Sequence, residues 1–320
     1  MLRERATRLQ ACARGVGAVI KLATRGSALA LAQTGTVAEA LRKLGVAVEI
    51  VTITTEGDTS TASLASLGGS GVFASALREA LIDGRCDAVV HSLKDLPTAA
   101  FPGLAIGAIP KREDARDALC ARDDFTLETL PDGAKVGTGS PRRRAQLLAR
   151  RPGLDVVDIR GNVDTRLGKV PGELDAVVLA AAGLSRLGRL DAVTDFLGIN
   201  NWPTAPGQGA VAVEVRAGEE KSVVALDHKS TRIVATAERE VLARLEAGCA
   251  APVGVNAFVE DGLLFLSARV YSLDGTAQLT SSHALYLSDV KEPGSELAER
   301  VARELLDGGA ADLAPLGATG

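Results

Sequence analysis

Short apolar runs alternate with segments whose apolar residues recur every three or four positions through residues 19–215. The runs predict strands, and the recurring spacing predicts helices. The predicted strands are residues 19–23, 46–54, 87–91, 104–109, 135–138, 156–159, 175–179 and 210–215. Strands that alternate with helices are typical of α/β lobes. Because the chain also has connecting segments at 110–114 and 203–207, we expect two such lobes with strand ends facing a central cleft.

The pattern changes from about residue 227. A long helix over 231–247 precedes strands at 253–259, 263–271 and 277–287, and a last helix covers 294–307. Asp261–Gly262 and Asp274–Gly275 separate these strands and are typical of hairpin turns. The region is therefore predicted to be a small α+β C-terminal domain. The expected boundaries are an extension at 1–18, domain 1 at 19–112 with 205–226, domain 2 at 113–204 and domain 3 at 227–320.

Arginine is concentrated in residues 135–167, where two predicted strands each end at a turn that leads into a helix. Ser140 suits the N-cap of the first helix and Pro141 its first position, which places Arg142 and Arg143 in the first turn. Cations there oppose the helix dipole, so local helix stability does not explain them. A ligand anion does explain them, because free backbone N–H groups and guanidinium groups would both contact it.

The same reasoning extends to Arg160 and Arg166, which follow the second strand. Arg25 repeats the order of strand, arginine, turn and helix near the N-terminus, before a helix that Ser27 would cap. We therefore expect an anion site built from turns at strand ends. A solvated basic face is the alternative, and we prefer it for the arginines on the helix body, Arg144, Arg150 and Arg151.

Charge and composition narrow the class of anion. The 320 residues include 36 basic and 40 acidic side chains, a net charge of −4, and only 3% of residues are aromatic. A general nucleic-acid binder is usually basic over a whole domain, so a small polyanion is the expected ligand. The 4 cysteines show no paired spacing, which predicts a reducing compartment and neither disulfides nor a zinc site. No apolar run reaches membrane-spanning length, and residues 1–18 resemble an organelle transit remnant only weakly; we expect a cytoplasmic protein.

Two further positions carry candidate chemistry. Lys94 and Asp95 follow a predicted buried strand at the edge where open α/β sheets bind ligands, and a surface salt bridge is the alternative. Cys249 follows a helix-ending glycine in a loop, where it is either exposed or a buried free thiol. His91 alone is more often a satisfied core histidine than a catalyst, so we assign it no chemistry.

Several segments, taken in order, resemble the porphobilinogen deaminase family, also called hydroxymethylbilane synthases, from about residue 20 to 306. They are ATRGSALALAQ, VVHSLKDLP, REDARDAL, VGTGSPRRRAQ, IRGNVDTRL, LAAAGLSRLG, APGQGAVAVE and LEAGCAAPVG. The resemblance implies two periplasmic-binding-protein-like lobes plus a third domain, and a dipyrromethane cofactor attached covalently to Cys249. It implies a transferase of porphyrin biosynthesis that joins four porphobilinogen molecules head to tail, releases ammonia at each step and finally hydrolyses off the linear tetrapyrrole.

The resemblance also implies roles for individual residues. Asp95 matches the catalytic carboxylate. The cofactor-binding positions are Cys249, Lys94, Ser92, Thr138, Ser140, Arg142 and Arg143, and the positions for incoming substrate or elongating chain are Arg25, Ser27, Gln33, Arg160, Arg166 and Arg186. No metal is implied. Each pyrrole carries an acetate and a propionate, and an arginine-dense site suits that charge because guanidinium binds carboxylate bidentately and stays charged.

The sequence departs from the family at two places. Many members carry lysines in the glycine-rich loop that precedes Phe73, whereas here residues 67–71 read LGGSG. The surrounding stretch, 56–72, predicts a long mobile loop that could act as a lid. Ala250 stands where larger polar residues are common, which leaves the cysteine nucleophile unaffected.

Two other functions compete with this transferase. A non-enzymatic two-lobe carboxylate-binding protein would need no Cys249, and would usually have a secretory signal or a DNA-binding domain; neither is visible in the sequence. A nucleic-acid binder would use the arginine cluster with a steep salt dependence, which the acidic net charge argues against. We expect a monomer that binds neither nucleic acid nor membrane.

Overall fold

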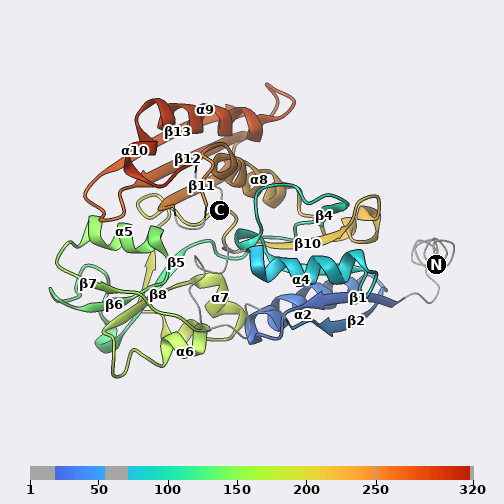
Figure 1. Cartoon of the computed structure of the whole chain (residues 1–320), viewed down its shortest axis with the longest axis horizontal. Coiled ribbons are helices and arrows are strands. Elements are labelled where there is room, and N and C mark those ends of the chain that lie inside the picture. The colour runs from blue at the N-terminus through green and yellow to red at the C-terminus, as the bar shows by residue number, and fades with distance from the viewer. Residues whose placement is uncertain (1–18, 55–70, 249–250, 318–320) are drawn as a thin grey trace. The chain divides into compact units, whose positions relative to one another are not determined.

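The computed structural model describes residues 19–54, 71–248 and 251–317. The chain divides into two compact units, Met1–Arg112 with Ala210–Arg232 and Glu113–Gly209 with Ile233–Gly320. Cys249 lies outside the described residues, as does most of the predicted loop 56–72. The first unit holds one sheet and the second unit holds two (Figure 1).

The first unit is an α/β lobe with the strand order β2-β1-β3-β10-β4. Its strands are β1 Val19–Thr24, β2 Ala47–Thr52, β3 Ala88–Ser92, β4 Leu104–Ala108 and β10 Val211–Arg216, and its helices are α2 Ala28–Lys43 and α4 Gly71–Ile82. Strands β2, β1 and β3 are parallel, whereas β10 runs antiparallel to β3 and β4. β10 is also the strand by which the chain returns to this unit.

Alternation along the strands explains why helices cover both faces of this sheet. Leu22 packs in one apolar cluster with Val37 and Leu41 of α2. Its neighbour Ala23 packs in another with Leu77 and Leu81 of α4. Successive side chains of a strand point to opposite faces, so α2 and α4 cover opposite sides.

The second unit contains a lobe with the same kind of strand order, β7-β6-β8-β5-β9. Its strands are β5 Asp117–Ala121, β6 Lys135–Gly137, β7 Asp155–Val157, β8 Ala176–Ala180 and β9 Asp195–Leu197, and its helices are α5 Pro141–Arg150, α6 Val163–Leu167 and α7 Ala181–Arg186. The antiparallel strand, β5, again lies second from an edge and is the strand that enters the lobe. The prediction of two α/β lobes of the periplasmic-binding-protein class is confirmed, and the cleft between them stays a prediction.

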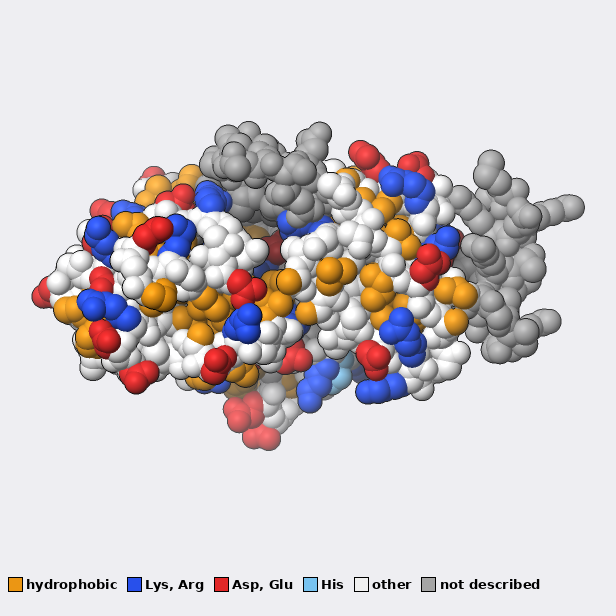
Figure 2. Space-filling view, turned by 90° about the horizontal axis from the view of Figure 1, so that it is seen from below, with side chains coloured by type: hydrophobic (Ala, Val, Ile, Leu, Met, Phe, Trp, Pro, Cys, Tyr) orange, Lys and Arg blue, Asp and Glu red, His pale blue; other side chains and the backbone are white. Residues whose placement is uncertain are grey.

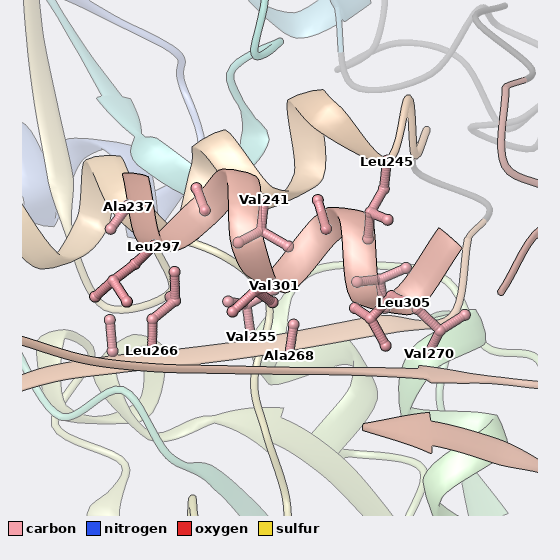
Figure 3. Close-up of a cluster of buried hydrophobic side chains, with 14 of the residues drawn as sticks. Ala237, Val241, Leu245, Val255, Leu266, Ala268, Val270, Leu297, Val301 and Leu305 are labelled. Atoms are coloured by element: carbon pink, nitrogen blue, oxygen red, sulfur yellow. The ribbon is translucent and has the colours of Figure 1, made fainter. Parts of the chain in front are cut away.

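The rest of the second unit is the small α+β domain expected from the sequence. Antiparallel strands β11 Val253–Glu260, β12 Leu263–Tyr271 and β13 Gln278–Tyr286 form its sheet, and its helices are α8 Lys229–Arg244, α9 Pro293–Asp307 and α10 Ala310–Leu313. Figure 3 shows α8 and α9 contributing Val241, Leu297 and Val301 to one apolar cluster with Leu266 and Val270 of β12. Each of these side chains is almost fully buried, so this cluster is the core of the domain.

Several details differ from the sequence predictions. The helix expected to end at residue 247 ends at Arg244, and Glu246 adopts a left-handed φ of 47°. The spacing of leucines and valines in residues 28–44 also predicts an apolar helix face that includes Leu31 and Leu44, but these two side chains are 40% and 55% exposed. The buried stripe of α2 runs through Val37 and Leu41. The predicted boundaries of the three domains stay a prediction.

Candidate active site

In the first unit, the turn from β1 into α2 brings predicted substrate and cofactor residues together. Ser27 caps α2 by accepting a hydrogen bond from the Ala30 N–H at 3.3 Å. Gln33, one turn further and only 5% exposed, donates from Nε2 to Ser92 Oγ at 2.8 Å. Arg25 is half-buried at the start of the same turn. The structure therefore joins Gln33, predicted for substrate, to Ser92, predicted for the cofactor.

Lys94 and Asp95 lie in a single 3-10 turn, Leu93–Asp95, that follows β3 directly. Leu93 and Leu96 on either side are buried, at 0% and 4% exposure, and the Leu93 N–H donates to the carbonyl of Ala210 at 3.1 Å. Between these anchors the Asp95 side chain is exposed and Lys94 is half-buried. A rigid turn therefore presents the Asp95 carboxylate to solvent at the carboxyl end of a buried strand, where ligands of such sheets bind.

His91, on β3 itself, is a core histidine as expected. It is 8% exposed, and its Nε2 lies 3.2 Å from Oε2 of Glu214 on β10. Arg78 of α4 donates to both oxygens of the same carboxylate, with its shortest contact at 2.8 Å. Burial opposes ionisation of Glu214, but hydrogen bonds and charges from His91 and Arg78 lower its pKa overall. The group is a buried network between α4, β3 and β10.

In the second unit, the turn from β6 into α5 has the predicted capping geometry. Ser140 is the N-cap, Pro141 occupies the first turn, and Ser140 Oγ accepts from the Arg143 N–H at 3.5 Å. Thr138 Oγ1 accepts from the Ser140 N–H at 3.2 Å. A side chain at Gly139 would place its Cβ 2.7 Å from the Ile159 carbonyl oxygen. Thr138 and Ser140 thus shape the backbone of the turn, which any ligand at this helix end would meet.

Arg142 and Arg143 are buried, at 4% and 6% exposure, and they share one counterion. Arg142 Nη1 lies 2.9 Å from Oδ2 of Asp117, and Arg143 Nη2 lies 2.6 Å from Oδ1. Arg143 Nη1 also donates to the carbonyl of Val178 at 3.0 Å. The Nε–H of Arg143 is buried without a hydrogen-bond partner among the described residues. Since a buried unpaired donor is costly, this N–H is suited to an acceptor from a ligand.

Arg160 and Arg166 follow β7, on a turn in which Gly161 adopts a φ of +109° and Asn162 caps α6. Arg166 donates from Nε to the Gly161 carbonyl at 2.8 Å. Burial lowers the pKa of Arg166, and the positive charges of Arg143 and Arg160 lower it further, with only Asp158 acting in the opposite sense. Arg143 and Arg160 therefore each repel the guanidinium of Arg166, and we call the three residues the arginine cluster (Arg143, Arg160 and Arg166). An anion placed among them would relieve that repulsion.

Arg186, at the end of α7, donates from Nη2 to the carbonyl of Gly209 at 2.7 Å. Burial lowers the pKa of its guanidinium, and the charge of Glu113 partly offsets the effect. It is thus held by backbone on the segment where the chain leaves the second lobe. The contacts of Arg186 do not place it in the arginine cluster.

Sequence reasoning missed Asp117, Trp202 and Gln208. Asp117 is fully buried, and besides the two arginines it accepts from Trp202 Nε1 at 2.9 Å and from Gln208 Nε2 at 2.8 Å. Its position within the motif REDARDAL was the available signal. Among the helix-body arginines, Arg144 and Arg150 are exposed as expected, and Arg150 pairs with Glu128 at 2.7 Å. The expectation of a solvated side chain is wrong for Arg151, which is half-buried because it donates to the backbone carbonyls of Leu127, Glu128 and Leu130.

Other site chemistries find little support in the described part of the chain. No cluster of His, Cys, Asp and Glu there could hold a metal ion. None of its helices is both long and apolar enough to span a bilayer. Figure 2 shows basic and acidic side chains interspersed over the face that it draws. The described surface in that view has no extended basic stripe of the kind that binds a duplex.

Comparisons with known proteins identify the family of this chain. Residues 20–224 match the family model "Porphobilinogen deaminase, dipyromethane cofactor binding domain", and residues 233–307 match "Porphobilinogen deaminase, C-terminal domain". Relatives named porphobilinogen deaminase include one from Leifsonia xyli, 61% identical over 93% of this chain and 94% of its own length. The relative from Cutibacterium acnes is 52% identical over 94% of this chain and 98% of its own length. The relative from Thermobifida fusca is 51% identical over 91% of this chain and 94% of its own length.

A solved periplasmic substrate-binding protein from Coxiella burnetii covers 69% of this chain and 96% of its own at 16% identity, with a TM-score of 0.40. That score is too low to support a shared fold, so the fold class rests on the strand order of the two lobes. The family models cover most of the described residues, and the three relatives cover 93%, 94% and 91% of the chain. The chain therefore belongs to the porphobilinogen deaminase family.

Proposed function

We propose that this chain joins four porphobilinogen molecules head to tail on a covalently bound dipyrromethane primer and then releases the linear tetrapyrrole hydroxymethylbilane by hydrolysis. Each condensation releases one ammonia, and one water is consumed in the final release. The arginine cluster is the observation that carries the proposal. Arg143 and Arg160 both repel Arg166, and Arg143 keeps a buried N–H that has no hydrogen-bond partner among the described residues. A ligand rich in carboxylates, such as an acetate- and propionate-bearing pyrrole, would satisfy both features.

The residues of the second unit fit the anionic cofactor that the family binds. Arg143 offers its Nε–H, and the turn Thr138–Ser140 presents the N-terminus of α5, where carboxylates bind favourably. When bound, the cofactor supplies a nucleophilic pyrrole carbon to which the first substrate is joined. Cys249 is the proposed attachment point, and Ser92, Lys94 and Arg142 are proposed to assist in holding it. Gln33 would support this group through its hydrogen bond to Ser92.

Asp95 is proposed as the catalytic carboxylate. Loss of ammonia from porphobilinogen leaves positive charge on the pyrrole, and a nearby carboxylate stabilises that charge and can accept the pyrrole N–H proton. The turn between Leu93 and Leu96 holds Asp95 at a set position while its side chain stays exposed. Arg25, Ser27, Arg160, Arg166 and Arg186 are proposed to bind the carboxylates of the incoming substrate and the elongating chain.

We further propose that the enzyme works as a cytoplasmic monomer. Cys86 and Cys120 are free and buried, which is common in a reducing compartment. The relatives named above are bacterial proteins. Family membership disfavours a purely carboxylate-binding protein.

The stoichiometry of turnover tests the activity. Purified enzyme given porphobilinogen should release one ammonia per substrate consumed and one linear tetrapyrrole per four substrates. Tight binding of porphobilinogen with no ammonia released would support the carboxylate-binding alternative and refute the enzymatic proposal. Arg150→Gln is a matched control, because among the described residues this exposed arginine pairs with Glu128 alone, and the substitution should leave the stoichiometry and rate unchanged.

A further inference from the structure

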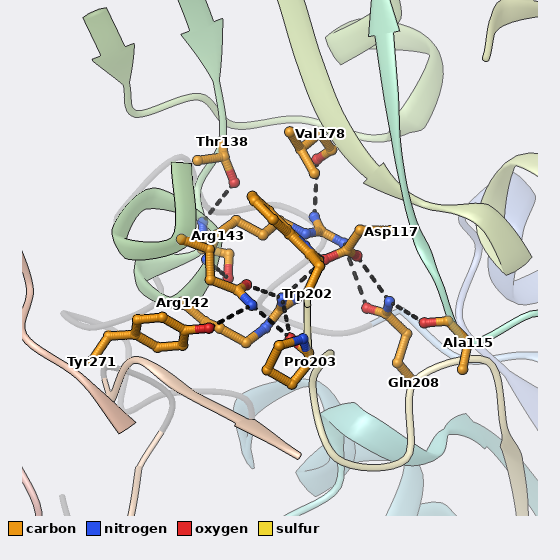
Figure 4. A network of polar contacts seen from close by, with 12 residues as sticks. Ala115, Asp117, Thr138, Arg142, Arg143, Val178, Trp202, Pro203, Gln208 and Tyr271 are labelled. Atoms are coloured by element: carbon orange, nitrogen blue, oxygen red, sulfur yellow. Dashed lines mark hydrogen bonds and ion pairs between the residues drawn. The ribbon is translucent and has the colours of Figure 1, made fainter. Parts of the chain in front are cut away.

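A single buried carboxylate organises the two arginines at the start of α5 (Figure 4). Asp117 begins β5, an inner strand that pairs with β8 on one side and β9 on the other. Its Oδ2 contacts Arg142 at 2.9 Å and Trp202 Nε1 at 2.9 Å. Its Oδ1 contacts Arg143 at 2.6 Å and Gln208 Nε2 at 2.8 Å. Four donors therefore saturate one carboxylate that has no exposed surface.

The charges of this network do not balance. Arg142 and Arg143 bring two positive charges into a buried region and Asp117 returns one negative charge, so one positive charge is left over. Burial opposes ionisation of Asp117, but the two arginines and the hydrogen bonds from Arg143 and Gln208 hold its pKa well below the usual range. Asp117 is thus ionised at neutral pH. The surplus charge is felt outside the network, since Arg143 lowers the pKa of Arg166.

The contacts also assign different work to the two arginines. Arg142 ties the second lobe to the C-terminal domain: its Nη1 reaches the Pro203 carbonyl at 3.1 Å and Gln146 Oε1 at 2.6 Å, and Gln146 in turn contacts the hydroxyl of Tyr271 at 3.2 Å. Arg143 is held at its two terminal nitrogens, by Val178 at Nη1 and by Asp117 at Nη2. Its Nε–H is the donor left unpaired.

We propose that Asp117 is the positioning residue of the cofactor site. It fixes the guanidinium of Arg143 so that the free Nε–H of Arg143 meets a carboxylate of the dipyrromethane. It also neutralises the charge of Arg142, so that the surplus positive charge of the network faces that carboxylate. The inference rests on the family's cofactor and on Arg143 as one of its ligands. It deepens the proposed function by naming the residue that orients this ligand. Guanidinium groups fixed in advance lose less entropy on binding an anion.

Asp117→Asn tests the idea, because it keeps the size of the side chain and removes its charge. Asp175→Asn is the matched control. Asp175 lies directly before strand β8, and the last residue of β8 pairs with Asp117. The Asp175 carboxylate contacts Arg122 Nε at 2.6 Å and accepts from the Lys135 N–H at 2.6 Å. Both variants lose an arginine-paired carboxylate of the same sheet, but Asp175 has no contact with Arg142 or Arg143 among the interactions described above.

Intact mass gives the fraction of molecules that carry the cofactor, and thermal unfolding gives stability separately. We expect Asp175→Asn to be fully loaded and Asp117→Asn to be loaded at least about tenfold less, as expected for loss of one charged hydrogen bond. Trp202 is the single tryptophan of the chain and donates a hydrogen bond to Asp117. Its fluorescence therefore reports on the hydrogen-bond network around Asp117. Loading cofactor-free enzyme with porphobilinogen should shift this emission in wild type and not in folded Asp117→Asn.

Full cofactor content in folded Asp117→Asn would overturn the proposal. If Asp117→Asn does not fold, Gln208→Met decides, since it removes a hydrogen bond at the same oxygen that holds Arg143 while keeping all charges. Slower loading of folded Gln208→Met, with an unchanged Trp202 environment before loading, supports positioning. Loading at the wild-type rate would show that Asp117 only stabilises the fold.

Discussion

Replacing Asp95 by Asn should slow the release of ammonia strongly while leaving the fold almost untouched. The side chain of Asp95 is exposed, and the turn that carries it is anchored by Leu93 and Leu96. Asn has the same shape as Asp and can occupy the same turn. Its amide has no negative charge with which to stabilise the cationic pyrrole that forms as ammonia leaves.

The expected magnitudes follow from this placement. Substitution of an exposed residue away from caps and buried networks usually changes the free energy of unfolding by less than about 0.5 kcal/mol. Removal of one group placed to stabilise transition-state charge usually costs about a hundred- to a thousandfold in rate. Substrate binding should weaken far less than turnover, because the charge develops mainly in the transition state. Asp95→Glu keeps the charge at a shifted position and should retain part of the activity.

The assay is single-turnover release of ammonia from enzyme whose cofactor content has first been confirmed by mass. Loading must be checked because the primer is itself assembled from pyrrole units. Asp83→Asn is the control, an exposed carboxylate of the same unit that lies 3.6 Å from Arg85, and it should react at the wild-type rate. A near-normal rate for loaded Asp95→Asn would refute the catalytic assignment and leave Asp95 as a surface charge.

Arg143→Leu should yield mostly cofactor-free protein, whereas Arg166→Leu should keep the cofactor and accumulate partly elongated chains. Mass spectra of both variants, with Arg150→Leu as the control, check this prediction. Equal cofactor content in the two variants would refute the separate roles of Arg143 and Arg166. Burial raises the pKa of the Cys120 thiol to about 12, so at pH 8 only about one molecule in ten thousand holds its thiolate; native protein should resist alkylation at Cys120, and rapid labelling would contradict the buried placement. In the folded protein the pKa of Asp117 lies below its ordinary value of 3.8. The contribution of Asp117 to the free energy of unfolding is therefore complete above pH 3.8 and is lost progressively as the pH falls below that value. Thermal unfolding from pH 7 to 3 should therefore show a steeper acid loss in wild type than in Asp117→Asn, and identical slopes would contradict the ion pairs.

Local signals in the sequence predicted the local structure well. Ser27 and Ser140 cap the helices expected of them, and Pro141 lies in the first turn of α5. These features depend on a few neighbouring residues, because a cap is satisfied within one turn of its helix. The hairpin signals at Asp261–Gly262 and Asp274–Gly275 likewise lie between the observed strands β11, β12 and β13.

Long-range pairing explains what the sequence could not predict. Asp117 reads as the polar start of an apolar strand, and its partners Arg143, Trp202 and Gln208 lie 26, 85 and 91 positions away. Position alone in the first turn of α5 suggested that both arginines face a ligand, whereas the fold supplies them with an internal counterion. The catalytic role of Asp95 came only from family resemblance, since an exposed carboxylate after a strand has no distinctive local pattern.

The intact mass of the purified protein, followed by peptide mapping, tests the attachment of the cofactor most directly. We expect a mass above that of the sequence by two linked pyrrole units, with the adduct on the peptide that contains Cys249. Cys249→Ser should lose both the adduct and the activity, whereas Cys86→Ala, at a buried free thiol, should keep the adduct. An active enzyme of unmodified mass, or an adduct on any other residue, would contradict the central claim.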